Sequence, residues 1–313
     1  MTKRVISVFL CVLCVISSIS FIVSAKENKE YTSENFLSVA DGIIAWKKAD
    51  NGSEPDGYLI NDKYLENAGT TPGDWYPIAL GRLGIQDNNE GYLAVIKDRV
   101  EERYRESGRL SAAKATEWHR IALAVLAMGG DPTNFGTDEN GAPINLIADG
   151  TYDRGKTTPL GRQGINGWIW GLITLDSMRY AVPDGAYNTR DDIIVEIISK
   201  QLSDGGFALS SDDADPDITA MAITALAPYY NSEKIYSYHR KALSADESKT
   251  VHEVVDEAVL CLSRLQLDTG DYKSWGTQNV ESTDWVAVAL CSLNIDPLSD
   301  SRFIKTATPF LTV

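Results

Sequence analysis

Histidine, cysteine and positive charge are all scarce in this chain of 313 residues, and each shortage excludes a class of function. The three histidines, His119, His239 and His252, are too scattered for a zinc site, and four cysteines are too few for a disulfide scaffold. Lys and Arg number 29 against 44 Asp and Glu, so the net charge is −15. Such a chain repels nucleic acid and anionic lipid. We therefore expect no metal, no cofactor and no nucleic-acid partner.

The first 25 residues have a different composition from the rest of the chain. Lys3 and Arg4 precede an apolar run that ends at Val23, and small residues at Ser24 and Ala25 come before a polar segment. This order is typical of a secretory signal peptide, here cleaved after Ala25. The alternative is an uncleaved membrane anchor, because the run is nearly long enough to span a bilayer. We predict a secreted or cell-surface protein with no other membrane contact.

Cleavage would leave a single domain, 26–313, with a net charge of −17 once Lys3 and Arg4 are removed. Two cysteines, Cys261 and Cys291, remain in it, each within an apolar helical pattern. We expect two buried thiols, with a disulfide between neighbouring helices as the alternative.

An internal repeat organises this domain. Five apolar segments can be aligned so that four begin with a carboxylate, four carry Trp second and four carry Ala sixth. They are DWYPIALGRLG from Asp74, EWHRIALAVLA from Glu117, GWIWGLITLDS from Gly167, DITAMAITALA from Asp217 and DWVAVALCSLN from Asp284. Because they are apolar nearly all round, they predict helices buried on more than one side.

More amphipathic helices are expected between these inner helices, and alternating β-strand patterns are scarce. The alternation predicts two concentric rings of helices, an all-α solenoid that closes on itself. The expected outer helices cover residues 35–49, 91–106, 191–202 and 251–266, with a shorter one at 143–150.

The turns after the outer helices also repeat. A glutamine is followed by glycine at +4 and an aromatic residue at +6 in two places, and two further turns keep the Gly-x-aromatic half. Glycine ends a helix in a left-handed conformation, and the aromatic ring covers the helix end. The full turns are Gln201/Gly205/Phe207 and Gln266/Gly270/Tyr272, and the partial ones are Gly150/Tyr152 and Gly185/Tyr187.

These turns resemble the prenyltransferase/squalene oxidase repeat of terpenoid cyclases, protein prenyltransferases and cobalamin carriers of the intrinsic factor type. The resemblance covers about residues 33 to 313 and implies an α/α toroid of up to six helical hairpins. A signal peptide before a solitary toroid looks most like bacterial extracellular proteins of this kind. The sequence holds five and a half hairpins, so we expect a truncated chain, an open ring or a ring closed by a partner.

The resemblance raises the question of acid chemistry at residues 211–226, SDDADPDITAMAITAL. Cyclases of this family carry Asp-x-Asp-Asp before Thr-Ala, which places Asp215 and Asp217 on the first two acids and Ile218 on the last. An aliphatic residue cannot set the protonation state of Asp217 through charge or hydrogen bonds, so the motif is degenerate. The spacings required for magnesium diphosphate and for an EF-hand also fail.

Helix capping gives these acids a structural explanation. Asp215 can cap the helix, Pro216 suits its first position, and Asp217 lies in the first turn, where the helix dipole favours a negative charge. By alignment, Asp74, Glu117 and Asp284 would serve equally. Capping does not explain the tryptophans that recur beside them, for which core packing is the alternative.

We therefore expect a non-catalytic module that binds a small molecule, a glycan or an extracellular protein in an aromatic, acidic central cleft. The alternatives are a cyclase-like enzyme that uses Asp217, with Asp215 beside it, and a carbohydrate-active α6/α6 enzyme with two rim carboxylates. The expected ligand-binding residues are Asp74, Trp75, Tyr76, Glu117, Trp118, Trp168, Trp170, Asp217, Asp284 and Trp285.

Overall fold

The computed structural model describes residues 33–154 and 159–305. The predicted signal peptide and the cleavage after Ala25 lie outside these residues. Within them, no helix has both the length and the apolar character that crossing a bilayer requires. The described residues divide into two compact units: the first contains 33–112 and 117–149, and the second contains 113–116, 150–154 and 159–305.

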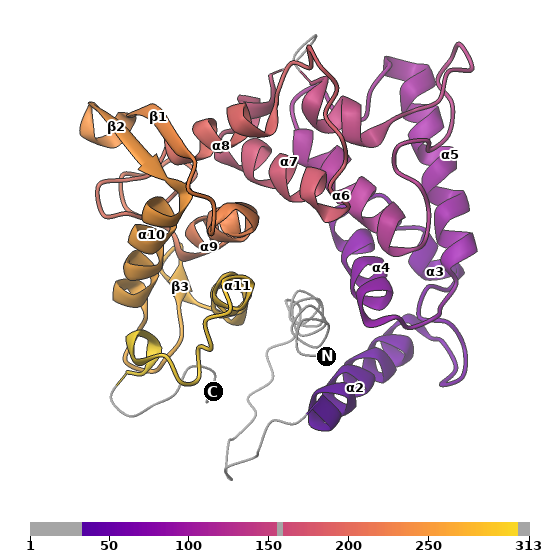
Figure 1. Cartoon of the computed structure of the whole chain (residues 1–313). Helices are drawn as coiled ribbons and strands as arrows, with labels where there is room; N and C mark the ends of the chain where they lie inside the picture. Colours follow the sequence, from indigo (N-terminus) through magenta and orange to yellow (C-terminus); the bar gives the residue numbers. More distant parts are fainter. Residues whose placement is uncertain (1–32, 155–158, 306–313) are drawn as a thin grey trace. The chain divides into compact units, whose positions relative to one another are not determined.

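Helices dominate both units, as expected for the mostly helical class (Figure 1). The short outer helix predicted at 143–150 is present as a single π-helical turn, η1 (Ala148–Tyr152), which begins later than predicted. The first unit contains α2 (Ser33–Asn51), α3 (Asp62–Leu65), α4 (Thr71–Leu83), α5 (Asn89–Ser107), most of α6 (Ala115–Ala127) and the start of η1. The second contains α7 (Ile165–Ser177), α8 (Arg190–Ile198), α9 (Pro216–Leu226), α10 (Val251–Leu265) and α11 (Val280–Ser292).

Helix α9 is central in the second unit, because α7, α10 and α11 all pack against it. Its buried face carries small residues, and Ala220, Ala222 and Ala225 are at most 2% exposed. Small side chains let helix backbones approach closely, which accounts for the alanines that recur in the inner helices. Figure 1 shows α9 and α11 side by side.

The two Gln-Gly-aromatic turns make the same hydrogen bonds. Gln201 Nε2 donates to the carbonyls of Gly205 at 2.8 Å and Val254 at 2.9 Å. Gln266 Nε2 donates to the carbonyl of Gly270 at 2.9 Å and to that of Phe303 at 3.0 Å. The glutamine therefore joins the turn to a later element, α10 in the first case and the short helix η5 (Ser301–Phe303) in the second, a role that the sequence pattern did not reveal.

The aromatic residues of these turns divide into two groups. Phe207 and Tyr272, from the full motifs, are completely buried, as predicted for rings that cover a helix end. Tyr187, from a partial motif, is 55% exposed, so the same role does not extend to it. Tyr152, from the other partial motif, is 8% exposed, so burial of the aromatic ring does not depend on the glutamine alone.

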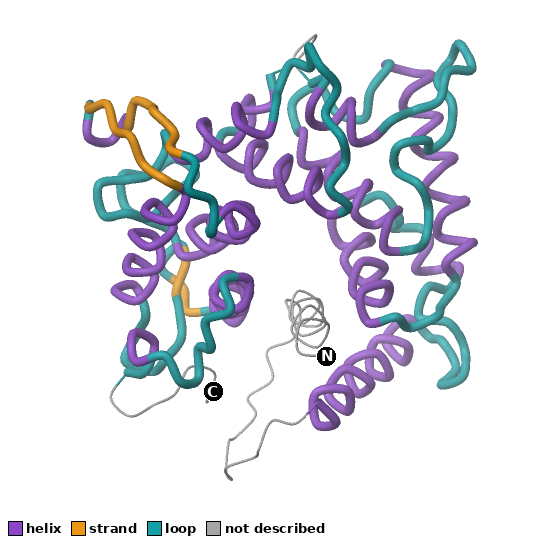
Figure 2. Tube along the Cα trace, viewed as in Figure 1, coloured by secondary structure: helices purple, strands orange, loops and turns teal. Residues whose placement is uncertain are grey.

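A β-hairpin in the second unit was not predicted. Strand β1 (Ile235–Arg240) pairs with β2 (Ala245–Thr250), and the shorter β3 (Lys273–Ser274) pairs with β4 (Thr277–Gln278) (Figure 2). In β1 the buried positions alternate at Tyr236, Tyr238 and Arg240. A single alternating segment of six residues among long helical patterns is a weak signal.

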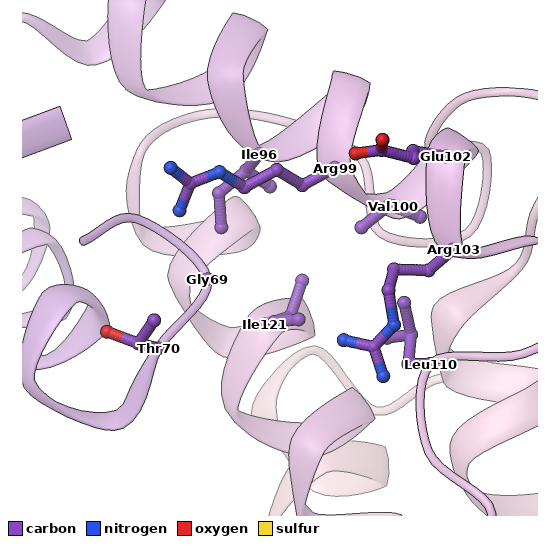
Figure 3. Close-up of a pocket in the computed structure, with 9 residues that line it drawn as sticks. All are labelled: Gly69, Thr70, Ile96, Arg99, Val100, Glu102, Arg103, Leu110 and Ile121. Atoms are coloured by element: carbon purple, nitrogen blue, oxygen red, sulfur yellow. The ribbon is translucent and has the colours of Figure 1, made fainter. Parts of the chain in front are cut away.

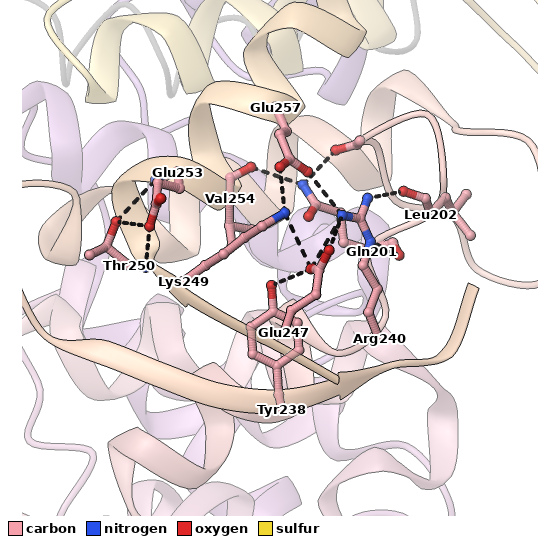
Figure 4. Close-up of polar contacts among 11 residues, drawn as sticks. Gln201, Leu202, Tyr238, Arg240, Glu247, Lys249, Thr250, Glu253, Val254 and Glu257 are labelled. Atoms are coloured by element: carbon pink, nitrogen blue, oxygen red, sulfur yellow. Dashed lines mark hydrogen bonds and ion pairs between the residues drawn. The ribbon is translucent and has the colours of Figure 1, made fainter. Parts of the chain in front are cut away.

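Arg240 fixes this hairpin to the first Gln-Gly-aromatic turn. Its guanidinium is buried and donates to the carbonyls of Gln201 and Leu202 and to Glu257 at 3.0 Å (Figure 4). Lys249 pairs with Glu257 and with Glu247. The cluster satisfies turn carbonyls that burial would otherwise leave without donors.

The two thiols of the described chain are free. Cys261 is buried and Cys291 is half-buried, which confirms the expected thiols and excludes the disulfide alternative. Burial raises the pKa of Cys261 to about 11, so this thiol is unreactive at neutral pH.

Candidate functional site

The inner helices can be aligned by the hydrogen bonds that end them. In four of them, an amide donates to the carbonyl five residues earlier, past a residue with positive φ. The carbonyls belong to Leu80 in α4, Val125 in α6, Leu175 in α7 and Leu290 in α11. Six residues before them lie Asp74, His119, Ile169 and Asp284. Asp74 and Asp284 therefore occupy the same position of the repeat, as the sequence alignment predicted.

Asp217 does not share that position. The backbone N–H of Phe207 donates to Thr219 Oγ1 at 2.9 Å, and that of Tyr272 donates to Thr283 Oγ1 at 3.1 Å. With these threonines matched, Asp217 aligns with Glu281. The alignment from sequence was three residues out for α9, and two residues out for Glu117. A shift of three residues keeps an apolar stripe on nearly the same helix face, so the pattern could not detect it.

The capping prediction is confirmed for α9 only. Asp215 caps this helix and accepts from the backbone N–H of Ile218 at 3.1 Å, with Pro216 at the first helical position. In α11 the cap is Asn279. Asp74 lies in the first turn of α4 but does not cap it, because Thr70 holds the cap position, and Asp284 lies beyond the first turn of α11.

Asp74 is completely buried, and its carboxylate accepts three hydrogen bonds. Its carboxylate accepts from Arg120 Nε, from the Tyr92 hydroxyl and from the backbone N–H of Gly69, each at 2.7 Å. Arg120 also donates to the carbonyl of Gly69 at 2.9 Å. Burial raises the pKa of Asp74, and the three hydrogen bonds oppose that rise. The carboxylate has no position open to a ligand.

Asp284 is equally buried, with 3% of its surface exposed. Neither of its oxygens has a hydrogen-bond partner among the residues that the structure describes. Burial, assisted by the nearby charge of Glu281, raises the pKa of Asp284 to about 8. The carboxyl group is therefore mostly protonated at neutral pH and is a potential hydrogen-bond donor.

Asp217 is half-buried at the start of α9. Its Oδ1 is buried and has no hydrogen-bond partner within the described part of the chain. Burial raises the pKa of Asp217, with a further rise from Asp215, while the hydroxyls of Ser282 and Ser274 lower it. Ser274 donates to Asp215, not to Asp217. Asp217 is thus an acceptor beside serine hydroxyls of α11 and β3.

The expected tryptophans do not share one environment. The rings of Trp170 in α7 and Trp285 in α11 meet edge to face, with centroids 5.8 Å apart, and both side chains are half-buried. The structure brings these two together, and by the helix-end alignment they share a repeat position with Trp75. Trp168 instead packs against Gly161. Trp118 is buried and donates to the Tyr104 hydroxyl at 2.9 Å, while Tyr76 is buried beside Tyr64.

Glu117, in the first unit, lies beside a pocket that was not predicted. It accepts from Arg103 at 3.1 Å. The pocket has a volume of about 310 Å³ and is formed by α5, α6 and two loops (Figure 3). Arg99 and Arg103 lie one helical turn apart on α5 and both line it. That i, i+4 spacing of arginines in an acidic chain was the available signal.

Among the residues described, no group of three or more His, Cys, Asp or Glu side chains could hold a metal ion. The first unit thus contains neutralised acids beside an arginine-lined pocket. The second contains unpartnered acids and a tryptophan pair. These are two separate candidate sites, each confined to its own unit.

Comparison of the chain with protein-family models, curated proteins and solved structures finds no match.

Proposed function

We propose that this chain is a non-catalytic binding module built from helical hairpins that close as an α/α toroid. Two turns with the same glutamine bonds, and inner helices that end alike, support a repeat of this kind. The binding site we propose is the surface of α7, α9 and α11 in the second unit. The proposal includes export from the cell, on the strength of the first 25 residues.

The observation that carries this proposal is the edge-to-face tryptophan pair, with an acid at the start of the helix that packs against both of its helices. Trp170 and Trp285 come from α7 and α11, and Asp217 begins α9, which packs against both helices. Half-buried aromatic rings offer a flat apolar surface, and the half-buried carboxylate of Asp217 offers an acceptor for a hydroxyl or amine. A glycan has both an apolar face and a rim of hydroxyl donors, so it fits this chemistry best.

Titration of the full chain with defined oligosaccharides, followed by tryptophan fluorescence, tests the proposal. We expect binding that Trp170→Ala and Trp285→Ala each weaken by at least about tenfold, given the size of aromatic contributions to binding. Trp46→Ala in α2, at an exposed ring outside this surface, is the matched control. Unchanged affinity in both variants would show that the pair is merely packed.

Acid catalysis is the second candidate, favoured by the raised pKa of Asp217 and its unpartnered oxygen. A carboxylic acid beside an aromatic surface could act as a proton donor to an alkene or to a glycosidic oxygen. Incubation with squalene and with the same oligosaccharides, followed by product analysis, separates the two functions. A product that forms with the parent chain and not with Asp217→Asn would show that the protein is an enzyme and not only a binding module.

A further inference from the structure

The pocket of the first unit has an apolar floor and a charged rim. Its floor is formed by four side chains that are at most 4% exposed. A cavity of about 310 Å³ is at the lower end of the range for small-molecule sites. The floor residues are Ile96 and Val100 of α5, Leu110 of the following loop and Ile121 of α6.

Arg99 brings a positive charge that no carboxylate of the described chain pairs with. Its guanidinium donates to the carbonyls of Leu65, Glu66 and Ala68, at the end of α3. These bonds hold the side chain at the rim, but carbonyl oxygens do not neutralise it. A fixed guanidinium with unused N–H groups is suited to a planar anion.

Arg103 completes the rim from one turn further along α5. It has one acceptor among the described residues, Glu117 at 3.1 Å, and its side chain is 44% exposed. A guanidinium has five N–H donors, so most of those of Arg103 are unused. Figure 3 shows Arg99 above Ile121 and the guanidinium of Arg103 on the other side of that residue. Glu102, also on the rim, is the acid that an anionic ligand would have to avoid.

We propose that this pocket binds a small amphiphilic carboxylate, with its apolar chain on the floor and its carboxylate between Arg99 and Arg103. Arginine forks bind carboxylates in a planar, charge-assisted geometry, and the apolar floor favours a chain over a compact anion. Glu117 then competes with the ligand for Arg103. This site is independent of the tryptophan surface of the second unit.

Octanoate is the probe, and octanamide is its neutral counterpart of the same length. Calorimetric titration of the full chain should show octanoate binding, at least about tenfold tighter than octanamide because of the charge-assisted bonds. Arg103→Met keeps the apolar stem and removes the charge, so octanoate should bind about tenfold more weakly while octanamide is unchanged.

Glu117→Gln is the most discriminating variant, because we expect it to increase the affinity for octanoate. Loss of the competing carboxylate should tighten octanoate binding by up to about fivefold, the range of an exposed ion pair. If Glu117 were itself a ligand-binding residue, the same variant would weaken binding. Ile121→Trp, which fills the floor, should abolish binding of both probes. Equal affinity for octanoate and octanamide, or octanoate binding that survives Arg103→Met and Ile121→Trp unchanged, overturns the proposal.

Discussion

Asp74 and Asp284 occupy the same position in two copies of the repeat, yet one is saturated with hydrogen bonds and the other has none. Asp74 in the first unit receives Arg120 from the next inner helix and Tyr92 from the next outer helix. Asp284 in the second unit is as deeply buried and receives no donor from the residues that the structure describes. An identical residue at an equivalent position is therefore a structural ion pair in one unit and a protonated acid in the other.

The difference shows that the environment of a buried acid is set by neighbours far away in sequence. Arg120 lies 46 residues from Asp74, and Tyr92 lies 18 residues from it. A buried carboxyl group keeps its charge only if such donors offset the loss of hydration. Without them the neutral form is favoured, and the pKa of Asp284 rises to about 8.

The largest loss of stability is expected from Asp74→Ala. The change leaves the guanidinium of Arg120, which is 16% exposed, without its acid, so unfolding should become easier by about 3–5 kcal/mol. Urea denaturation followed by circular dichroism measures this loss. In a double-variant cycle with Arg120→Met, the second change should cost much less than it does alone. Additive losses would show that the two side chains do not act as a pair.

Asp284→Asn is expected to stabilise the protein, by an amount that depends on pH. An acid whose pKa rises from 3.8 to about 8 on folding contributes stability below pH 4 and loses it as pH rises through 8. The free energy of unfolding of the variant should therefore equal that of the parent near pH 4. Above pH 4 it should exceed the parent's by up to about 1.4 kcal/mol for each pH unit, to about pH 8.

Denaturation at pH 4, 6 and 8 measures this trend, with Asp213→Asn as the control because Asp213 is exposed. Both variants replace a carboxyl group with an amide, but only one removes a buried acid. A parallel pH dependence in Asp284→Asn and its parent would mean that a donor reaches Asp284 in solution and makes it resemble Asp74.

A smaller loss is expected from Tyr92→Phe, which removes one donor from Asp74 and leaves Arg120 in place. A hydrogen bond to a charged group contributes about 1.5–3 kcal/mol. Tyr64→Phe is the matched control, since the Tyr64 hydroxyl donates at 3.1 Å to the neutral carbonyl of Gly73. That variant should lose only about 0.5–1.5 kcal/mol. Equal losses would indicate that Asp74 is not charged.

The inner helices, most outer helices and the turns could be predicted from sequence, because each depends on a local pattern. Apolar periodicity marked α4, α6, α7, α9 and α11, and Asp215-Pro216 marked the start of α9. The hairpin β1–β2 escaped prediction because its six-residue alternation is short. The alignment of Asp217 failed because a three-residue shift leaves a helical stripe almost unchanged.

The candidate sites were less predictable. The pairing of Trp170 with Trp285 joins helices more than a hundred residues apart, and the pocket depends on Arg99, Arg103 and Ile121 meeting across α5 and α6. No local pattern reports which residues of different helices meet. Of the features that form the pocket, only the spacing of the two arginines on α5 could be recognised in the sequence.

By itself, the sequence determined that this protein is mostly helical, with acids near the starts of several apolar helices. Periodicity and capping depend on residues within one turn of each other, so a linear reading captures them. Only the tertiary structure decided which acids keep their charge. Asp74 is paired and Asp284 is protonated because hydration lost on burial must be replaced by donors, and the helices that supply or withhold them come together only in the fold.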